Sequence, residues 1–417
     1  MELQSQGRNN YPNYRWVILS LLFAATTINY LDRIVLSVVV KYVKEDLQMD
    51  DQQYSYVVMA FLVMYTIGYL AAGRVIDWLG TKLGYLLSIL SWSAAVSLTG
   101  LSGSISSLAF WQGLLGITEG GNFPAAIKSV AEWFPAKERA LATSLFNSGP
   151  SIALVVGPPV IAAITLNMGW RCTFAIVGAS GFVLVAIWPF LYKHPKHAID
   201  NQEQEKKPTQ TRLKWRQLLK YKETHGIMIC KFFSDPVWYF YIFWLPNYLY
   251  YRRGFNIKEN AMALVVVYGI AIVLGNFAGW ITGYLIRRGW TPLSARKMVM
   301  LACAICMPFS AFAVFAPNPW VAILLVSLAC SAHNGWAANT FSLISDCFPS
   351  RAVGSAVGLV GFVGSAGGIL VSAYLTGVIV KNFGYAPIFI LMGILHPLGM
   401  VFIHLFVKKG EPIQIEA

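Results

Sequence analysis

The sequence predicts an all-α polytopic membrane protein whose twelve transmembrane helices form two pseudo-symmetric six-helix bundles. Three observations support this prediction. Of the 417 residues, 56% are hydrophobic and only 12% are charged, which is typical of integral membrane proteins. The charged residues fall between apolar blocks, and most blocks have the roughly 20 residues that a helix needs to cross a bilayer. A long polar stretch near the middle divides the chain into two halves.

Each half contains six predicted spans. Those of the first half lie near residues 16–40, 54–72, 84–101, 108–130, 140–166 and 173–192. Those of the second half lie near residues 226–250, 261–286, 297–316, 320–347, 352–380 and 387–407. The alternating pattern of a β-barrel is absent, so backbone groups in lipid must be satisfied within helices. The first span is too long for a signal-peptide core and lacks a small-residue cleavage site, so we expect it to stay in the membrane.

The positive charges predict the orientation of the chain. Of 32 Lys and Arg residues, 23 lie on the cytoplasmic side or at the cytoplasmic ends of spans if both termini are cytoplasmic, 7 lie outside, and 2, Arg33 and Lys231, lie well inside spans. Cytoplasmic loops of membrane proteins are enriched in Lys and Arg. The pattern therefore predicts a multi-pass protein with both termini in the cytoplasm. It also explains the net charge of +13 without a nucleic-acid partner, leaving the lipid bilayer as the expected surrounding.

The predicted order of segments follows from these spans. It is a cytoplasmic N-terminus (1–15), a first bundle (16–192), a basic cytoplasmic linker suited to anionic lipid (193–225), a second bundle (226–407) and a cytoplasmic tail (408–417). A weak internal repeat supports two related halves, because Glu132-Trp133-Phe134-Pro135 resembles Asp346-Cys347-Phe348-Pro349. Two similar halves around a site at mid-membrane are the plan of many secondary transporters.

The strongest functional signal is the adjacent acid and base Asp32 and Arg33 inside the first span. Ionisable groups at membrane depth are costly and usually mark transport pathways. Mutual neutralisation is the weaker explanation, because adjacent side chains on a helix point about 100° apart. Glu119 is a second intramembrane acid, and it lies beside Gly120 and Gly121. The alternative explanation for Glu119 is a structural role, in which a neighbouring helix that crosses closely at the glycines satisfies the carboxylate.

These groups suit proton-driven uptake of a small organic anion. The planar guanidinium of Arg33 can hold a carboxylate by two hydrogen bonds, so Arg33 is the predicted substrate anchor. Asp32 and Glu119 are the predicted proton-coupling residues, because a carboxyl that is desolvated in one conformation and hydrated in another can take up and release a proton. The proton is the only coupling ion that we expect. No cofactor is predicted, and no cysteine or histidine cluster completes a metal site around Cys303 and Cys306.

Several motifs carry a family resemblance that covers essentially the whole chain. The loop Gly73-x3-Asp77-x2-Gly80-x-Lys82 resembles the signature between helices 2 and 3 of the major facilitator superfamily. The motifs Asn29-Tyr30-Leu31-Asp32-Arg33 and Glu119-Gly120-x2-Phe123-Pro124 resemble its anion:cation symporter branch, as does Glu132-Trp133-Phe134-Pro135-x2-Glu138-Arg139. The run from Phe233 to Leu249 is similar to the seventh helix of the hexuronate transporters in that branch.

The resemblance implies a function. It implies a monomeric secondary transporter in a bacterial inner membrane that imports a sugar acid, such as galacturonate or glucuronate, by proton symport with alternating access. Asp32 and Glu119 fall on positions implicated in protonation in related symporters. Arg74, Asp77 and Arg139 fall on positions that form a latch at the cytoplasmic ends of the helices, which is a gating role.

The seventh span contains a second charged pair, Lys231 and Asp235. The two residues are one helical turn apart and can form an intrahelical ion pair. A structural or gating role is favoured over substrate contact, because Asp235 precedes Pro236 and can hold a break in the helix.

Sugar hydroxyls require neutral donors and acceptors beside an aromatic wall. The predicted substrate-binding residues besides Arg33 are Asn29, Tyr30, Tyr65, Trp238, Asn247, Asn334 and Asn339. The alternative for each is a polar group that only joins two helices. The same alternative applies to Tyr69, and packing is favoured for His333.

One departure from the family pattern concerns the substrate. Many relatives have Arg seven positions before the acid of the fourth span, whereas this chain has Gln112. A substrate with one carboxylate is therefore favoured over a dicarboxylate. The chain lacks ATP-binding and hydrolase motifs, which excludes a pump and disfavours an enzyme. The main alternative is a uniporter or exchanger of another small monocarboxylate, such as an aldonate or aromatic acid.

Overall fold

The computed structural model describes residues 14–134, 136–193, 215–348 and 350–408, and within these ranges the regular structure is helical without strands. The predicted cytoplasmic N-terminus, most of the linker at 193–225 and the tail lie largely outside the described residues. The first half contains α1 (Tyr14–Val38), α2 (Val40–Asp46), α3 (Asp51–Leu79), α4 (Thr81–Thr99), α5 (Ile105–Glu119), α6 (Asn122–Trp133), α7 (Ala136–Phe146) and α8 (Gly149–Leu191).

The second half begins with the short helix α10 (Trp215–Leu218). It continues with α11 (Lys222–Arg253), α12 (Ile257–Arg287), α13 (Pro292–Cys306), the 3-10 helix η1 (Met307–Val314), α14 (Pro319–Cys347), α15 (Ser350–Gly367), the π-helical turns η2 (Gly368–Leu375), α16 (Thr376–Phe383) and α17 (Tyr385–Phe406). Helix α11 therefore begins four residues earlier than the predicted seventh span.

The helices account for twelve membrane passes. Eight stretches of helix are long and apolar enough to cross a bilayer. One of them includes α8, which contains two passes because the backbone breaks at Gly169 with a φ of 81°. Three further passes are shorter or more polar, and they are α4, α5 together with α6, and α11. The predicted all-α, twelve-helix architecture is confirmed.

Two predicted spans are interrupted. The fourth span breaks at Gly120 and Gly121, between α5 and α6, and the fifth breaks at Asn147 and Ser148, between α7 and α8. Hydropathy does not detect these breaks because each involves only two residues in an otherwise apolar stretch. Local backbone hydrogen bonds continue across both, as from the Gly120 N–H to the Gly116 carbonyl at 3.3 Å and from the Asn147 N–H to the Thr143 carbonyl at 3.0 Å, so little backbone is left for lipid to satisfy.

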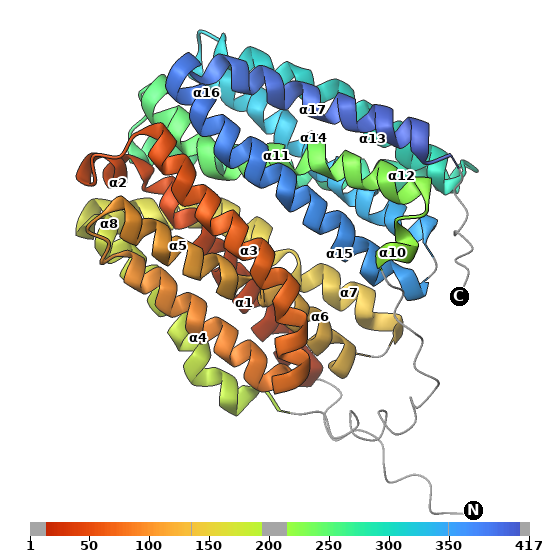
Figure 1. Ribbon diagram of the computed structural model, residues 1–417, viewed down its shortest axis with the longest axis horizontal. Helices are drawn as coiled ribbons and strands as arrows, with labels where there is room; N and C mark the ends of the chain where they lie inside the picture. The colour runs from red at the N-terminus through yellow and green to blue at the C-terminus, as the bar shows by residue number, and fades with distance from the viewer. Residues whose placement is uncertain (1–13, 135, 194–214, 349, 409–417) are drawn as a thin grey trace, which may run out of the picture.

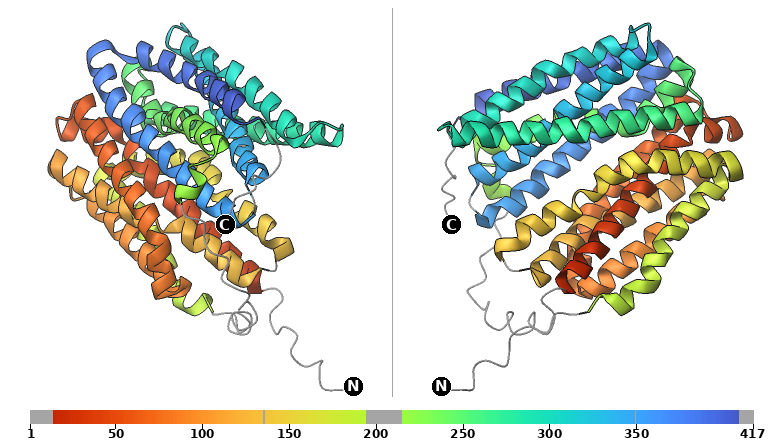
Figure 2. Two further views of the ribbon diagram at one scale, coloured as in Figure 1. Left: turned by 45° about the vertical axis from the view of Figure 1, so that its right-hand side comes forward. Right: turned by 180° about the vertical axis from the view of Figure 1, so that it is seen from behind.

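The two halves lie side by side, with α1 to α8 in one bundle and α11 to α17 in the other (Figure 1). The bundles meet at the end where α2 and α16 lie, and their helices diverge toward the end where α10 and the described C-terminus lie (Figure 2). We call these the closed end and the open end.

Polar contacts between the halves concentrate at the closed end. Among the described residues, four side-chain hydrogen bonds join the two bundles there. They are Tyr54 Oη to the Phe243 carbonyl at 2.7 Å, Tyr250 Oη to the Val38 carbonyl at 2.7 Å, Asn247 Nδ2 to Asp51 Oδ1 at 2.8 Å and Lys381 Nζ to Asp50 Oδ2 at 2.9 Å. Because Asp51 also accepts from Lys44 of its own half at 2.7 Å, its carboxylate is the centre of this contact.

Glycines bring α3 and α5 into close contact. A Cβ atom at Gly68 would lie 2.2 Å from the Ile117 carbonyl oxygen, and one at Gly116 would lie 2.3 Å from that of Phe61. The two backbones can approach this closely only because these positions have no side chain, as at other membrane helix crossings. The crossing lies one turn from Glu119 and thereby sets the depth and direction of that carboxylate.

Gly116→Ala should destabilise the protein, because the new methyl group meets fixed backbone and forces α3 and α5 apart. We expect a loss of about 1–3 kcal/mol, the usual cost of overpacking, measured as a lower midpoint of thermal unfolding in detergent. Gly113→Ala is the matched control, since its Cβ would meet Met64 Cγ at an ordinary 3.5 Å. Equal midpoints for the two variants would contradict the close crossing.

Asp51→Ala should open the closed end, because it removes the acceptor shared by Asn247 and Lys44. The probe is Ser55→Cys, placed where Ser55 is fully buried against Gly377 of the other half, in a Cys172→Ser background. A charge-assisted hydrogen bond contributes about 1.5–3 kcal/mol, so labelling by a membrane-impermeant maleimide should accelerate by about 10-fold or more.

The control for this experiment is Asp46→Ala. Asp46 lies at the same end but pairs with Arg171 of its own half at 2.8 Å, so its loss breaks no contact between the bundles. Similar labelling rates in both variants would show that Asp51 does not hold the halves together.

Candidate functional site

A buried ion pair between α1 and α5 forms the centre of the candidate site. Arg33 donates from Nε at 3.0 Å and from Nη2 at 2.8 Å, and both bonds go to Oε2 of Glu119. The side chains are 3% and 0% exposed. Both hydrogen bonds use one carboxylate oxygen, and Oε1 of Glu119 has no protein partner. Arg33 and Glu119, which were predicted to have separate functions, therefore form one unit.

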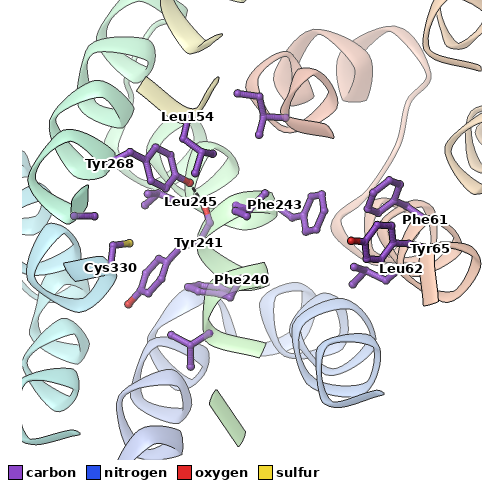
Figure 3. Close-up of a cluster of buried hydrophobic side chains, with 14 of the residues drawn as sticks. Phe61, Leu62, Tyr65, Leu154, Phe240, Tyr241, Phe243, Leu245, Tyr268 and Cys330 are labelled. Carbon is purple, nitrogen blue, oxygen red and sulfur yellow. Dashed lines mark hydrogen bonds between the residues drawn. The ribbon is translucent and has the colours of Figure 1, made fainter. Parts of the chain in front are cut away.

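Aromatic rings surround the Arg33 guanidinium. Its Cζ atom lies 4.5 Å from the ring centroids of both Tyr30 and Tyr65 and 5.4 Å from that of Phe61. Such positions favour a cation electrostatically and hold the planar guanidinium in place. Phe61 and Tyr65 of α3 face Phe243 of α11 across the interface between the halves (Figure 3). The aromatic wall predicted around Tyr30 and Tyr65 thus lies at Arg33.

Asp32 does not pair with its neighbour Arg33. Its carboxyl is 1% exposed, and neither oxygen has a hydrogen-bond partner in the protein. Asn29, one turn away, is fully buried with both amide atoms unpartnered. Gln112 of α5 is also buried, and its Nε2 has no partner. The first half therefore contains a set of buried polar atoms that protein contacts do not satisfy, which is uncommon in a folded interior.

The second half contributes the Lys231–Asp235 pair of α11. Lys231 Nζ lies 2.6 Å from Asp235 Oδ1, so the predicted intrahelical ion pair is present. A Cβ at Gly364 of α15 would lie 2.1 Å from Asp235 Oδ2, which explains why glycine is needed there. Tyr239, one turn beyond Asp235, stacks on Phe243 with ring centroids 6.4 Å apart.

Three further predicted residues lie in the second half. Trp238 is half-buried on α11 and stacks on His333. Asn334 is half-buried and donates to the Ala271 carbonyl at 3.3 Å. Asn339 is buried and accepts from Thr282 of α12 at 2.9 Å while donating to the Gly335 carbonyl. Asn339 therefore joins α12 to α14, which is the alternative considered for polar residues in spans.

The placement of Asn247 differs from the prediction of a substrate contact. Its amide donates to Asp51 and, at 2.6 Å, to Tyr385 Oη. In this conformation Asn247 joins the halves at the closed end and does not face Arg33. The sequence pattern could not distinguish these roles. A polar residue two turns beyond Tyr239 is compatible with the substrate site and equally with the contact between the halves at the closed end.

The predicted gating residues of the first half lie toward the open end. Asp77 pairs with Lys128 of α6 at 2.8 Å. Arg139 of α7 donates to the Phe134 and Ala131 carbonyls. Arg74 is exposed, and no other described residue bonds its side chain. No hydrogen bond or ion pair joins any of the three to a described residue of the second half.

Some residues of the site were absent from the prediction. Lys128 pairs with Asp77, Tyr239 stacks on Phe243, and His396 of α17 bonds His333. Tyr239 lies within the run from Phe233 to Leu249, but it stands between two aromatic residues that do not single it out, and His396 sits among apolar residues with no motif to mark it. Among the described residues, no group of three or more His, Cys, Asp or Glu side chains is arranged to hold a metal ion.

Twelve helices in two bundles, with a buried charged pair in each half, follow the plan of many membrane transporters. The chain belongs to the Major Facilitator Superfamily, whose family model matches residues 22–372 and 295–416. It is a multi-pass membrane transporter and not an enzyme.

Curated relatives cover nearly the whole chain. The hexuronate transporter of Escherichia coli strain K12 is 31% identical over 415 residues, which span 96% of each chain. A galacturonate transporter of Dickeya chrysanthemi is 34% identical over 260 residues, covering 60% of this chain and 75% of the relative. A probable galactarate/D-glucarate transporter of Bacillus subtilis strain 168 is 30% identical over 380 residues, covering 85% and 83%.

Solved structures show the same fold. A D-xylose-proton symporter aligns with a TM-score of 0.78 at 17% identity and covers 96% of this chain and 100% of its own. A bacterial homologue of the human lysosomal transporter Spinster, in an inward-facing conformation, aligns with a TM-score of 0.73 at 18% identity and covers 94% and 97%.

Proposed function

We propose that this protein imports a sugar acid, such as galacturonate or glucuronate, with protons by alternating access across a bacterial inner membrane. The sugar-acid relatives support the substrate class. The observation that carries the mechanism is the Arg33–Glu119 pair, because Arg33 is the cation that a substrate carboxylate would need and Glu119 already occupies it. Substrate and Glu119 therefore compete for one guanidinium.

This competition couples the anion to a proton. Protonation of Glu119 removes its charge and weakens its hold on Arg33, which then binds the carboxylate of the substrate. Loss of that proton restores the Glu119 carboxylate and displaces the substrate. By thermodynamic linkage, each ligand raises the affinity for the other by the same factor. The buried, aromatic surroundings strengthen the effect because the charges are poorly screened there.

Asp32 is the second proton-coupling residue in this proposal. A buried carboxylate that has no hydrogen bonds is costly when it is ionised. Asp32 is therefore the neutral acid in the conformation in which the halves are joined at the closed end. When the halves rock, hydration of Asp32 would allow it to ionise. The chain lacks a second arginine at Gln112, so the site offers Arg33 as its main cation and favours a monocarboxylate.

The excess of Lys and Arg in loops supports an orientation with the open end toward the cytoplasm. The conformation is then inward-facing, with Asp51 and its partners closing the outer side. Outward opening requires these contacts to break while the Arg74, Asp77 and Arg139 region closes against the second half. Lys231 and Asp235 would move with that half as a unit.

The outer pair Asp50–Lys381 is not the source of pH dependence in this proposal. Burial raises the pKa of the Asp50 carboxyl, but hydrogen bonds from the Gln53 backbone and Lys381 outweigh burial and hold the pKa below its usual value. The stabilisation is therefore present above the ordinary carboxyl range near pH 4 and is lost only as the pH falls through the lowered pKa. Asp50 stays ionised across the range in which uptake would respond to protons.

Arg33→Ala should abolish substrate binding, because it removes the cation that pairs with the carboxylate. Truncating one partner of a buried charge pair costs about 2–5 kcal/mol, so affinity for galacturonate or glucuronate should fall by about 30-fold or more in calorimetric titration. Arg33→Lys keeps the charge but loses the two-pronged geometry, and it should retain part of the affinity. The control is Arg171→Ala, at the exposed closed end. Unchanged affinity in Arg33→Ala would exclude the anchor assignment.

Glu119→Gln and Asp32→Asn should each uncouple transport, since neither amide can carry the proton. In proteoliposomes with an imposed pH gradient, the variants should fail to accumulate sugar acid but still exchange internal for external substrate. Asp50→Asn is the matched control and should keep pH-driven accumulation.

Two outcomes would overturn the coupling scheme. One is full pH-driven accumulation in both Glu119→Gln and Asp32→Asn. The other is wild-type uptake that a protonophore and the pH gradient leave unchanged, which would favour a uniporter or exchanger of the same fold.

A further inference from the structure

A pair of imidazoles is buried in the second half and makes no hydrogen bond to the charged pairs. His333 of α14 and His396 of α17 approach within 3.2 Å, from Nδ1 of His333 to Nε2 of His396. His396 is fully buried, whereas His333 keeps 5% of its surface. Nδ1 of His396 is buried without a hydrogen-bond partner. No described residue bonds Nε2 of His333, so that nitrogen is available to a ligand.

Aromatic contacts fix both rings. Trp238 stacks on His333 with ring centroids 5.3 Å apart and an angle of 8° between the planes. Trp336 packs its edge against His396 at 5.0 Å. Trp238 is half-buried and lies two turns from Lys231, on the same face of α11. His333 therefore lies beside the face of α11 that also carries Lys231.

The hydrogen bond determines which nitrogen of His333 carries a proton. Burial without a counter-charge disfavours an imidazolium, so each ring is neutral with one N–H. If His333 donated from Nδ1, the proton of His396 would sit on its own Nδ1, buried with no acceptor. If His396 donates from Nε2 instead, its Nδ1 is only an unused acceptor. Nδ1 of His396 is fully enclosed, whereas the residual exposure of His333 lets its Nε2–H reach water or a ligand. Because an orphaned buried N–H is rarer than an unused acceptor, the second arrangement is favoured, and it leaves the proton of His333 on Nε2.

We propose that His396 holds His333 in this tautomer and that Nε2–H of His333 donates a hydrogen bond to a hydroxyl oxygen of the transported sugar acid. The inference rests on the proposed function, in which the carboxylate binds Arg33 in the other half. His333 is then a substrate contact that recognises the uncharged part of the sugar acid, and Trp238 is the adjoining aromatic wall. His396 is a positioning residue that does not touch the substrate.

The test compares His396→Phe with His396→Gln. Phenylalanine removes the donor that sets the tautomer, whereas the glutamine amide can still donate to Nδ1 of His333. A neutral hydrogen bond contributes about 1 kcal/mol, so His396→Phe should weaken binding of the preferred hexuronate by about 5-fold to 10-fold. His396→Gln should stay within about 2-fold of wild type. His333→Phe should match His396→Phe, and the double variant should be no worse than either, because the residues act as a unit.

Deoxy analogues supply the control that a structural role would not reproduce. Galacturonate, glucuronate and their monodeoxy analogues are titrated into wild type and each variant. The analogue that lacks the contacted oxygen should bind wild type more weakly than the parent sugar acid does. Its affinity should be the same for wild type and for His396→Phe. The ratio of affinities within one variant does not depend on the fraction folded. Equal losses for every analogue in His396→Phe would overturn the assignment.

The tautomer can be measured without any variant. With six histidines in the chain, nitrogen-15 chemical shifts of labelled protein should show a protonated Nε2 and an unprotonated Nδ1 for His333. The opposite tautomer would overturn the proposal. A wild-type protein that binds neither galacturonate nor glucuronate would overturn both this inference and the proposed function. Normal binding with unchanged affinity in His396→Phe and His333→Phe would overturn this inference alone.

Discussion

The structure depends on one physical constraint, the cost of a guanidinium buried in a low-dielectric interior. Arg33 can occupy its position only with a counter-charge, and Glu119 supplies it through two hydrogen bonds to a single oxygen. The aromatic rings of Tyr30 and Tyr65 add electrostatic support without competing for hydrogen bonds. In the proposed mechanism such a site is stable without substrate but exchangeable, because the carboxylate of the substrate replaces Glu119 once that residue is neutral.

In the proposed mechanism, the surrounding architecture keeps Glu119 beside Arg33 while the halves move. Close packing at Gly116 and Gly68 positions Glu119 on α5, so the acid cannot drift from Arg33 when the halves move. The contacts that must break lie elsewhere, around Asp51 at the closed end. The charged pair on α11 is internal to one helix and moves as a body. Rigid bundles with a separable contact surface are what alternating access requires.

Much of the site followed from local sequence rules. Asp32, Arg33 and Glu119 stand out because charge is rare at membrane depth, and Lys231 and Asp235 pair as their spacing of one turn predicts. Other residues did not follow. Asn247 lies in the closed contact, Asn339 joins two helices, and His396 was not recognised at all. A single polar residue in an apolar span has no periodic partner, so its role depends on which helix faces it.

The sequence by itself determined the number of helices, the division into halves and the identity of the buried charges. Each of these follows from the free energy of transferring a local segment or a single group between water and lipid. Composition and spacing are enough to describe that free energy. Only the tertiary structure decided that Arg33 pairs with Glu119, 86 positions away, and that the adjacent Asp32 is left without a partner. Pairing depends on the directions in which side chains leave their helices and on where glycines let helices meet, and neither is a property of one segment.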